Sequence, residues 1–589
     1  MPARKSAPTD RVAILDWVLI AASIVALAWP IVDFSRFVYR AADPLPVDVA
    51  LGAVTILLVL EAARRSVGWI LPATAIAFIV YGWAGPFFDR IGLSLIAHRG
   101  YELDRLVGTL YMTLEGIFGV PLDVTSTYII LFTIYGAVLE ESGAGRFFID
   151  WSMAAMGRSR SGAAPGRTVT LAGFLLGTVS GSGVATTVML GSVSWPLLRG
   201  AGYRPETAGA ILSAAGIGAL ISPPTLGAAA FLIAEFLQIS YLQVLVMATI
   251  PTVLYYLSIF LMIEADSRRL ELGKPGVGSC ISTSAADPTT RDVEIQDLTP
   301  SSAGALFRKY GYHFTSLVAI AVFMIVGMSA FRAVFWSTVL AVALSFVRRE
   351  TALVPRKLTS ALESGATGVL GVVATTATAG IIVGVVTLTG LGLKISGLIV
   401  ALAGGHLFLT VVYSALAVWM LGLAVPVTAS YIIAAVMVAP ALVQAGVPDA
   451  AAHMFIFYYA VLSEVSTPTA LSPFAAAALT GANPFATMML TWKYTLPAFL
   501  VPFVFTLTPQ GEGVLLKGSL LDIATATLTA AAGVAMLAAG LGGWIRRRAS
   551  LVERVLATAA GALLCYGAGW ADFTGIIISA VVLFLHFRG

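Results

Sequence analysis

Glu464 is the residue whose type and surroundings point most directly to chemistry. It stands in an uncharged, apolar stretch, a few residues before a Pro-containing sequence that a continuous helix does not tolerate. If the stretch is embedded in a membrane, an ionised carboxylate there costs about 2.5–3.5 kcal/mol on insertion scales, and such residues usually serve a function. Glu464 is predicted to carry a proton or bind a sodium ion. The alternative is a carboxylate that faces a wet vestibule or pairs with an arginine.

Hydroxyl-bearing residues gather at four interruptions of apolar runs. Hard cations prefer oxygen ligands, and interrupted helices offer backbone N–H groups to anions and carbonyls to cations. The alternative is that each hydroxyl bonds to the preceding turn of its own helix. With Na⁺ as the candidate ion, the candidate substrate- and ion-binding residues are Ser180, Gly181, Ser182, Gly183, Thr186, Ser222, Pro223, Pro224, Thr225, Pro426, Thr428, Ser430, Glu464, Ser466, Thr467, Pro468 and Thr469.

The composition decides which elements position these residues. Of 589 residues, 58% are hydrophobic and only 11% charged, and the mean hydropathy is +0.91. Soluble domains average about 25% charged residues, so a compact water-soluble enzyme is excluded. A net charge of +4 is too weak for a nucleic-acid surface, and two cysteines make no disulfide framework. The chain is predicted to be an all-α polytopic membrane protein.

A bilayer crossing needs about 20 helical residues. The first apolar stretch, Val12–Val32, has span length and no cleavage site, and Arg4, Lys5 and Arg11 before it place the N-terminus in the cytoplasm. We therefore expect a multi-pass membrane protein. Further spans are predicted near 47–60, 67–84, 124–139, 241–263, 313–328, 334–346, 396–422, 430–443, 485–507, 521–544, 556–568 and from 573 onward. Lys493 is expected to snorkel from a helix end.

Two segments in the first half are long enough to cross a membrane, but the residues in their middle do not favour a continuous helix. The uncharged run between Arg167 and Arg199 contains Ser180-Gly181-Ser182-Gly183 near its middle, which predicts a re-entrant hairpin with its tip at mid-depth. The run Thr207–Ala234 is broken at Ser222-Pro223-Pro224-Thr225, which predicts a discontinuous helix.

The second half repeats this pattern. A Pro-containing tip at 422–430 interrupts one run, and 466–469 interrupts the next. A shift of 244 residues places Ser222, Pro224 and Thr225 on Ser466, Pro468 and Thr469, and the first tip on 424–427. Two halves that each contain a hairpin and a broken helix are typical of a secondary transporter built from structural repeats.

The same residues resemble the membrane component of tripartite ATP-independent periplasmic (TRAP) transporters, specifically the TAXI type, in which a small subunit is fused to a DctM-like large subunit. The resemblance covers nearly the whole chain, although each motif alone is weak. Its motifs lie at 115–119, 139–145, 181–182, 202–203, 223–224, 230–231, 234–236, 426–428, 439–442 and 453–459. The chain departs from the family where Glu464 replaces the aspartate of Ser-Asp-Ile-Thr-Pro-Pro, and at Gly183 and Thr186, where serine and asparagine are common.

The resemblance implies an inverted-repeat, elevator-type fold with two re-entrant hairpins and two discontinuous helices. The expected division is a small-subunit-like scaffold block at 1–120, a first repeat half at 121–265, a polar linker at 266–310, a second half at 311–510 and a C-terminal hydrophobic extension at 511–589. No function is predicted for the extension.

The implied function is ion-gradient-driven uptake of a small organic anion, a carboxylate such as a C4-dicarboxylate or a 2-oxoglutarate-like solute. The implied partner is a periplasmic TAXI-type substrate-binding protein, and the implied location is the bacterial inner (cytoplasmic) membrane. No cofactor is expected beyond the coupling ion, Na⁺ or H⁺. The substrate, the ion stoichiometry and the oligomeric state stay open.

Three other classes of function are alternatives to a secondary transporter. A channel also uses broken helices. An intramembrane enzyme needs a Ser–His pair, facing aspartates or a metal-binding histidine cluster, and the sequence has no such motif. An ATP-driven pump is disfavoured because no Gly-x-x-x-x-Gly-Lys-Ser/Thr loop occurs. The chain is therefore not expected to be an enzyme.

Overall fold

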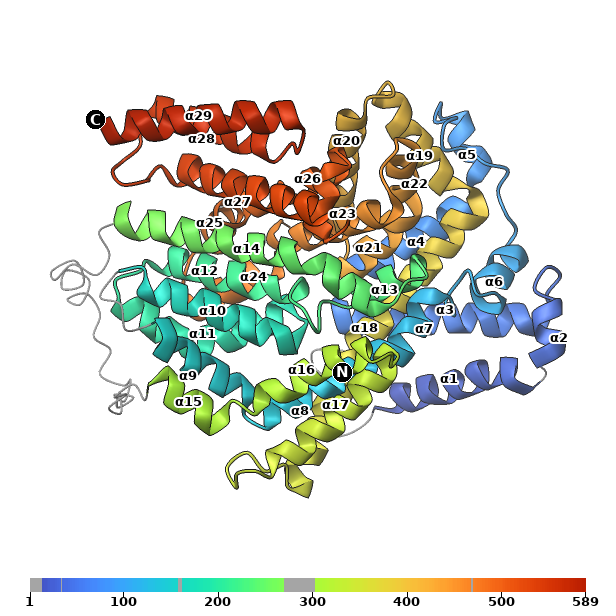
Figure 1. Ribbon diagram of the computed structural model, residues 1–589. Helices are drawn as coiled ribbons and strands as arrows, with labels where there is room; N and C mark the ends of the chain where they lie inside the picture. Colours follow the sequence, from blue (N-terminus) through green and yellow to red (C-terminus); the bar gives the residue numbers. More distant parts are fainter. Residues whose placement is uncertain (1–12, 33, 157–161, 270–301, 468–469, 589) are drawn as a thin grey trace. The chain divides into compact units, whose positions relative to one another are not determined.

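The computed structural model describes residues 13–32, 34–156, 162–269, 302–467 and 470–588, and the regular elements there are helices, apart from one isolated β-bridge between Trp544 and Arg548 (Figure 1). The all-α prediction is confirmed. Within these ranges, eight helices are long and apolar enough to span a membrane by length and composition. The N-terminal basic residues Arg4, Lys5 and Arg11, most of the expected 266–310 linker, and Pro468 and Thr469 lie outside the described residues.

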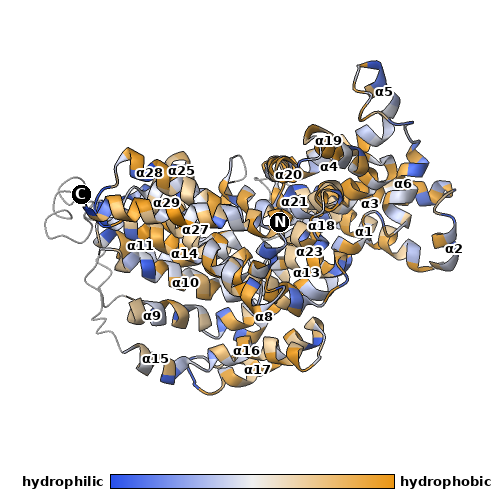
Figure 2. Cartoon of the chain, turned by 45° about the horizontal axis from the view of Figure 1, so that its top comes forward, coloured by the Kyte–Doolittle hydropathy of each residue, from blue (hydrophilic) through white to orange (hydrophobic). Residues whose placement is uncertain are grey.

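Hydrophobic residues are found along much of the length of the long helices (Figure 2). An 18-residue stretch of helix α1 (Ile14–Val32) has a mean hydropathy of 2.1, yet only 6% of this stretch is buried inside the protein. Large apolar side chains such as Trp17 and Ile24 are exposed on it. A helix that is apolar all round and faces outward is stable in lipid and not in water. The prediction of a polytopic membrane protein is confirmed.

The chain folds into two compact units, each assembled from separate stretches. Unit 1 comprises Met1–Ile130, Ala228–Gln238 and Ala366–Ser463. Its helices, in the described ranges, are α1, α2 (Phe34–Tyr39), α3 (Pro46–Val67), α4 (Ile70–Trp83), α5 (Gly85–Arg90), α6 (Leu103–Met112), α7 (Val120–Val124), the π-turn η1 (Thr125–Ile129), α13 (Ala229–Phe236), α19 (Leu391–Leu402), α20 (Leu407–Gly422), α21 (Val427–Met437), α22 (Ala439–Gln444) and α23 (Asp449–Leu462).

Unit 2 comprises Leu131–Gly227, Ile239–Gly365 and Glu464–Gly589. Helices α8 (Ile130–Glu141) and α18 (Pro355–Thr389) and the 3₁₀ turn η3 (Ser463–Val465) contribute to both units. The other helices of unit 2, in the described ranges, are α9 (Ala144–Met156), α10 (Ala164–Ser180), α11 (Gly183–Gly200), α12 (Pro205–Ile217), η2 (Gly218–Leu220), α14 (Tyr241–Arg269), α15 (Ala303–Tyr310), α16 (His313–Ile325), α17 (Ala330–Ser345), α24 (Leu471–Thr480), α25 (Pro484–Phe499), α26 (Val501–Leu507), η4 (Gln510–Leu515), α27 (Leu520–Gly542), α28 (Leu551–Leu564) and α29 (Gly569–Arg588).

All four predicted interruptions end helices. The first separates α10 from α11, and the second separates η2 from α13. The third separates α20 from α21, and the fourth separates η3 from α24. The predicted offset also holds for helix starts: Gly183 and Val427 begin α11 and α21, and Pro205 and Asp449 begin α12 and α23, each pair 244 residues apart. The repeat therefore lies in the fold and not only in the sequence.

The two repeats contribute to the units in opposite order. In unit 2, α24, which follows the second break, packs against α11 and α12 of the first repeat. In unit 1, α13, which follows the first break, packs against α21 and α23 of the second repeat. The chain changes unit at both breaks, between Gly227 and Ala228 and between Ser463 and Glu464. Each unit thus contains one hairpin, the helix before its own break, and the helix after the other break.

Three details differ from the prediction. The predicted span 396–422 is two helices, α19 and α20, because Gly404 and Gly405 adopt positive φ values of 58° and 79° that end α19. Helix α18, with 35 residues and a hydropathy of 2.2, was not predicted. Lys493 does not snorkel: its Nζ lies 2.6 and 2.7 Å from the two carboxylate oxygens of buried Asp266, which also accepts a 2.8 Å hydrogen bond from the hydroxyl of Tyr494.

Candidate functional site

The tip of the first hairpin is a tight turn whose shape requires glycine. Helix α10 ends at Ser180, and Gly181 follows in the left-handed region with φ +58°. A Cβ on Gly181 would lie 2.7 Å from the backbone oxygen of Leu226 in the first break. Ser182 caps α11 and accepts a 3.4 Å hydrogen bond from the Ala185 N–H. The tip is therefore in direct backbone contact with the first break.

The first break is held by side chains on both sides. Thr225 donates a 3.2 Å hydrogen bond to the carbonyl of Gly177 in α10, which ties the break to the hairpin. Ser222 donates a 2.6 Å hydrogen bond to the carbonyl of Gly218, one turn back on its own helix, so the hydroxyl-to-own-helix alternative applies at this position. The carbonyl of Pro224 accepts a 3.0 Å hydrogen bond from the hydroxyl of Tyr241.

Glu464 lies at the beginning of α11. Its Oε1 accepts a 3.0 Å hydrogen bond from the Ser472 hydroxyl, and a Cβ placed on Gly183 would be 3.4 Å from the same oxygen. The partial positive charge at a helix N-terminus favours an anion at this position. Among the described residues, no arginine, lysine or histidine pairs with Glu464. The carboxylate thus stands at the hairpin tip with a hydroxyl partner and no cationic one.

Several hydroxyls of α11 and α12, in the same unit as Glu464, lack partners among the described residues. Thr186, Thr187 and Ser213 are fully buried, and within the described parts of the chain their hydroxyl oxygens form no hydrogen bond. Thr187 lies at a close contact between α11 and α12, since its Oγ1 would be 2.1 Å from a Cβ on Gly216. A buried hydroxyl without a partner costs about 1–3 kcal/mol. Most buried polar groups in native proteins are hydrogen-bonded, so these three hydroxyls are candidates for contact with a bound ligand.

The second hairpin tip, in unit 1, shares two features with the first. Pro426 precedes α21 and Thr428 lies in its first turn. A Cβ on Gly422 would lie 2.1 Å from the Cβ of Ser463, so this tip also packs against the break of its own repeat. Ser430 is fully buried, and its hydroxyl has no hydrogen-bond partner among the described residues. Ser430 is the fourth residue of α21, as Thr186 is of α11.

The predicted site residues therefore fall into two groups. Unit 2 brings together Ser180, Gly181, Ser182, Gly183, Thr186, Ser222, Pro223, Pro224, Thr225 and Glu464, and it also contains buried Ser466 and exposed Thr467. Unit 1 contains Pro426, Thr428 and Ser430. Pro468 and Thr469 lie outside the described residues.

Sequence reasoning did not single out Ser213 and Ser472. Serine is ordinary in membrane helices, and neither residue stands in an interruption, so no sequence signal marked them.

The described residues hold no group of three or more His, Cys, Asp or Glu side chains that could bind a metal ion. A transition-metal centre is thus not formed by these ranges. The available donors are a single carboxylate, hydroxyls and the carbonyls at helix breaks, which is the ligand chemistry of hard cations.

Comparisons with known proteins are consistent with this geometry. The profile of the family described as "Tripartite ATP-independent periplasmic transporter, DctM component" matches residues 54–510. The chain is also 29% identical over 111 residues to a protein of Haemophilus influenzae named "Putative TRAP transporter large permease protein". That alignment covers 19% of this chain and spans about a quarter (26%) of the relative.

Proposed function

The chain belongs to the DctM component family of tripartite ATP-independent periplasmic transporters, and on this premise we propose that it is the membrane permease of an ion-driven secondary transporter. Its cargo is a small organic anion, of the carboxylate class, delivered by a periplasmic binding protein. The family is one of transporter permeases and not of enzymes. The TAXI type, with a small subunit fused at 1–120, is part of the proposal.

The observation that carries this proposal is the pair of equivalent, unsatisfied hydroxyls. Thr186 and Ser430 stand at the same position of the two repeats, 244 residues apart, buried and without a hydrogen-bond partner in the described ranges. A structural serine or threonine in a helix bonds back to its own preceding turn, as Ser222 does. We propose that cargo that enters and leaves supplies the missing partner.

Glu464 is proposed as the coupling residue. It has a hydroxyl partner in Ser472 and no basic partner among the described residues, so its negative charge is free to attract a proton or a sodium ion. The helix N-terminus at Gly183, beside the carboxylate, attracts anions. Once the carboxylate is neutralised by its ion, the same N-terminus is available to the carboxylate of the cargo. This order of events would couple the flux of the ion to the flux of the cargo.

The reciprocal arrangement of the repeats supports an inverted-repeat carrier of the elevator type. Each unit holds one hairpin together with the two helices that pack on it, and the chain changes unit at the breaks. A carrier alternates access by moving such bodies around a binding site.

Reconstitution tests this proposal. The full chain is placed in proteoliposomes with its periplasmic binding protein outside, and labelled carboxylates are scanned under an imposed Na⁺ or H⁺ gradient. Accumulation that depends on the gradient, the binding protein and the permease is expected. Uptake that only equilibrates the label, or that needs ATP, contradicts it.

A counterflow experiment separates a carrier from a channel. Proteoliposomes loaded with excess unlabelled substrate should transiently concentrate labelled substrate if the protein is a carrier, because the same site serves both directions. An open pore gives no such overshoot.

A further inference from the structure

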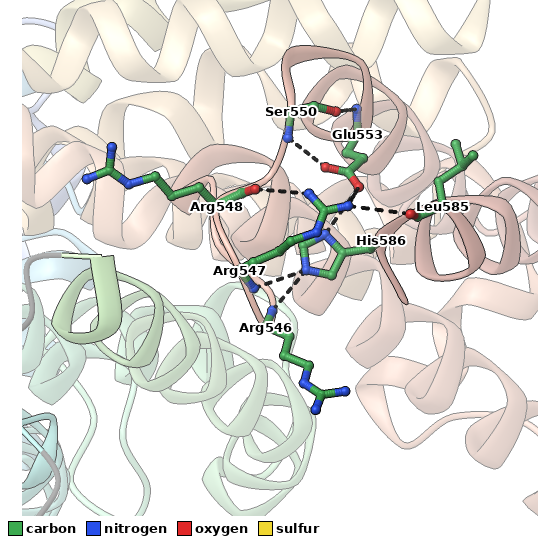
Figure 3. Close-up of polar contacts among 7 residues, drawn as sticks. All are labelled: Arg546, Arg547, Arg548, Ser550, Glu553, Leu585 and His586. Atoms are coloured by element: carbon green, nitrogen blue, oxygen red, sulfur yellow. Dashed lines mark hydrogen bonds and ion pairs between the residues drawn. The ribbon is translucent and has the colours of Figure 1, made fainter. Parts of the chain in front are cut away.

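The C-terminal extension, which lies beyond the residues matched by the family, contains an ordered arginine loop. Helices α27, α28 and α29 pack side by side in unit 2 (Figure 1). The loop 543–550 joins α27 to α28, and a β-bridge between Trp544 and Arg548 closes it. The end of α29 returns to the same place, where it brings His586 against the loop (Figure 3).

A buried polar network fixes the shape of this loop. His586 Nε2 accepts hydrogen bonds of 3.1 and 3.2 Å from the backbone N–H groups of Arg546 and Arg547. Because Nε2 faces two donors it is the acceptor nitrogen, and Nδ1–H therefore donates to Glu553 Oε1 at 3.2 Å. Arg547 Nη2 reaches the same oxygen at 3.1 Å, and the Ser550 N–H donates to Oε2 at 2.6 Å. The side chains of His586 and Glu553 are almost completely buried.

The side chain of Arg547 belongs to this network, whereas the side chains of Arg546 and Arg548 do not. The guanidinium groups of Arg546 and Arg548 point away from the network (Figure 3), and in the described parts of the chain neither has a hydrogen-bond or ion-pair partner. The arginines at the nearby end of α14 differ, since Arg268 and Arg269 pair with Glu264 and Asp266. Gly542 packs against Ala265, so the loop and the end of α14 lie at one level. The two free cations are thus held at the end of a bundle of spanning helices.

The surroundings of the two arginines are apolar. Leu551 and Val552 in the first turn of α28 are 76% and 62% exposed, and Phe584 and Phe587 near the end of α29 are also exposed. Arg546 lies over the Phe587 ring at 6.0 Å, and Arg588 over Phe584 at 4.3 Å. Free cations beside outward apolar side chains match a ligand with an anionic head and hydrocarbon tails.

We propose that Arg546 and Arg548, which extend in different directions from the loop ordered by His586 and Glu553 (Figure 3), each bind the phosphate headgroup of an anionic phospholipid, and that Leu551, Val552 and Phe587 contact the acyl chains. Guanidinium groups bind phosphate through paired N–H donors. Basic clusters at the ends of membrane helices attract anionic lipid. A lipid is preferred over a free anion because the cations adjoin an apolar surface. His586 is a positioning residue, since it holds the loop and does not itself contact the lipid.

Native mass spectrometry of the detergent-purified full chain tests lipid binding directly. Phosphatidylglycerol, phosphatidylcholine and inorganic phosphate are titrated against the wild type, Arg546→Gln/Arg548→Gln, and the control Arg146→Gln/Arg356→Gln, which removes two exposed arginines elsewhere in unit 2. Arg546→Gln/Arg548→Gln (the loop variant) is expected to bind phosphatidylglycerol about thirtyfold more weakly than the wild type, because it lacks two cations near an anionic membrane surface. Binding by the control should be unchanged. Phosphatidylcholine should bind weakly throughout.

Three results overturn the proposal: equal phosphatidylglycerol binding by the wild type and the loop variant, equal binding of the two lipids, or displacement of phosphatidylglycerol by inorganic phosphate at equal concentration. The last result would identify a free-anion site. If the double variant does not fold, Arg548→Gln alone serves, because this side chain is exposed and unpartnered in the described ranges.

Trypsin cleavage tests the positioning role. In nanodiscs with phosphatidylglycerol, His586→Ala is expected to be cut at the arginine loop at least several times faster than the wild type, and His586→Gln, which keeps an acceptor, is expected to restore part of the protection. Identical cleavage of the wild type and His586→Ala contradicts that role.

Discussion

The hydroxyl of Ser472 donates a 3.0 Å hydrogen bond to Oε1 of Glu464. The two residues flank the second helix break, and both lie at the beginning of α11 from the other repeat, because a Cβ on Gly183 would be 3.3 Å from Ser472 Oγ and 3.4 Å from Glu464 Oε1. The carboxylate is therefore oriented by a neutral donor, which leaves its charge uncompensated in the described part of the chain. A substitution that removes the charge of Glu464 and keeps a hydrogen-bond acceptor for Ser472 therefore tests the role of the charge alone.

Glu464→Gln is predicted to abolish gradient-driven uptake while folding and membrane insertion stay normal. The amide keeps an oxygen to accept from Ser472 but removes the charge that attracts the coupling ion. The measurement is substrate accumulation in proteoliposomes, with the melting temperature in detergent as the fold control. Asp104→Asn, at an exposed acid in unit 1, is the matched variant and should transport normally. Near-normal driven uptake by Glu464→Gln would remove this residue from the mechanism.

Gly181→Ala is predicted to destabilise unit 2. Its φ of +58° costs a residue with a Cβ about 1–2 kcal/mol, and the added carbon would be 2.7 Å from the Leu226 oxygen, so the cost should exceed that range. Thermal unfolding in detergent measures it. Gly200→Ala, at the other end of the same hairpin, meets no atom within 4 Å and should leave the melting temperature unchanged or raise it slightly. Equal melting temperatures for the two variants would contradict the conclusion that the turn at the first hairpin tip requires glycine at position 181.

A feature of this protein can be predicted from the sequence when residues close to it in the chain determine it. Prolines and glycines interrupt a helix wherever it packs, so the breaks near Ser222, Pro426 and Ser466 were predictable from composition and spacing. The exchange of α13 and α24 between the units was not, because it depends on which distant helices pack together. For the same reason Ser472 was missed, since its role follows from its contact with Glu464 and not from its type.

Lys493→Ala is predicted to reduce stability by about 3–5 kcal/mol, because it leaves the Asp266 carboxylate buried without its closest cation. Tyr494 and Arg269 remain as partners at 2.8 and 3.4 Å, so the lower end of the range is expected. Chemical unfolding of the purified chain measures the loss. Arg146→Gln removes a pair separated by 4.0 Å whose arginine is 90% exposed and should change stability by less than about 1 kcal/mol. A similarly small effect for Lys493→Ala would mean that Asp266 is solvated.

Thr186→Val and Ser430→Ala are predicted to impair transport without loss of stability. Neither hydroxyl has a hydrogen-bond partner in the described ranges, so replacing it with an apolar group of similar shape removes a desolvation cost and should be neutral or stabilising. If cargo or coupling ion supplies the missing partner, each variant should raise the half-saturating concentration of that ligand about tenfold, the effect of losing one hydrogen bond to a charged group.

The control for these two variants is Ser222→Ala, whose hydroxyl is already bonded to the carbonyl of Gly218. It should leave the half-saturating concentrations unchanged, because its hydroxyl is not available to a ligand. Substrate- and ion-concentration curves in proteoliposomes, combined with melting temperatures, distinguish the two kinds of hydroxyl. Unchanged half-saturation in both Thr186→Val and Ser430→Ala would show that the equivalent positions of the two repeats are structural, and the ion and cargo would then have to bind elsewhere along the breaks.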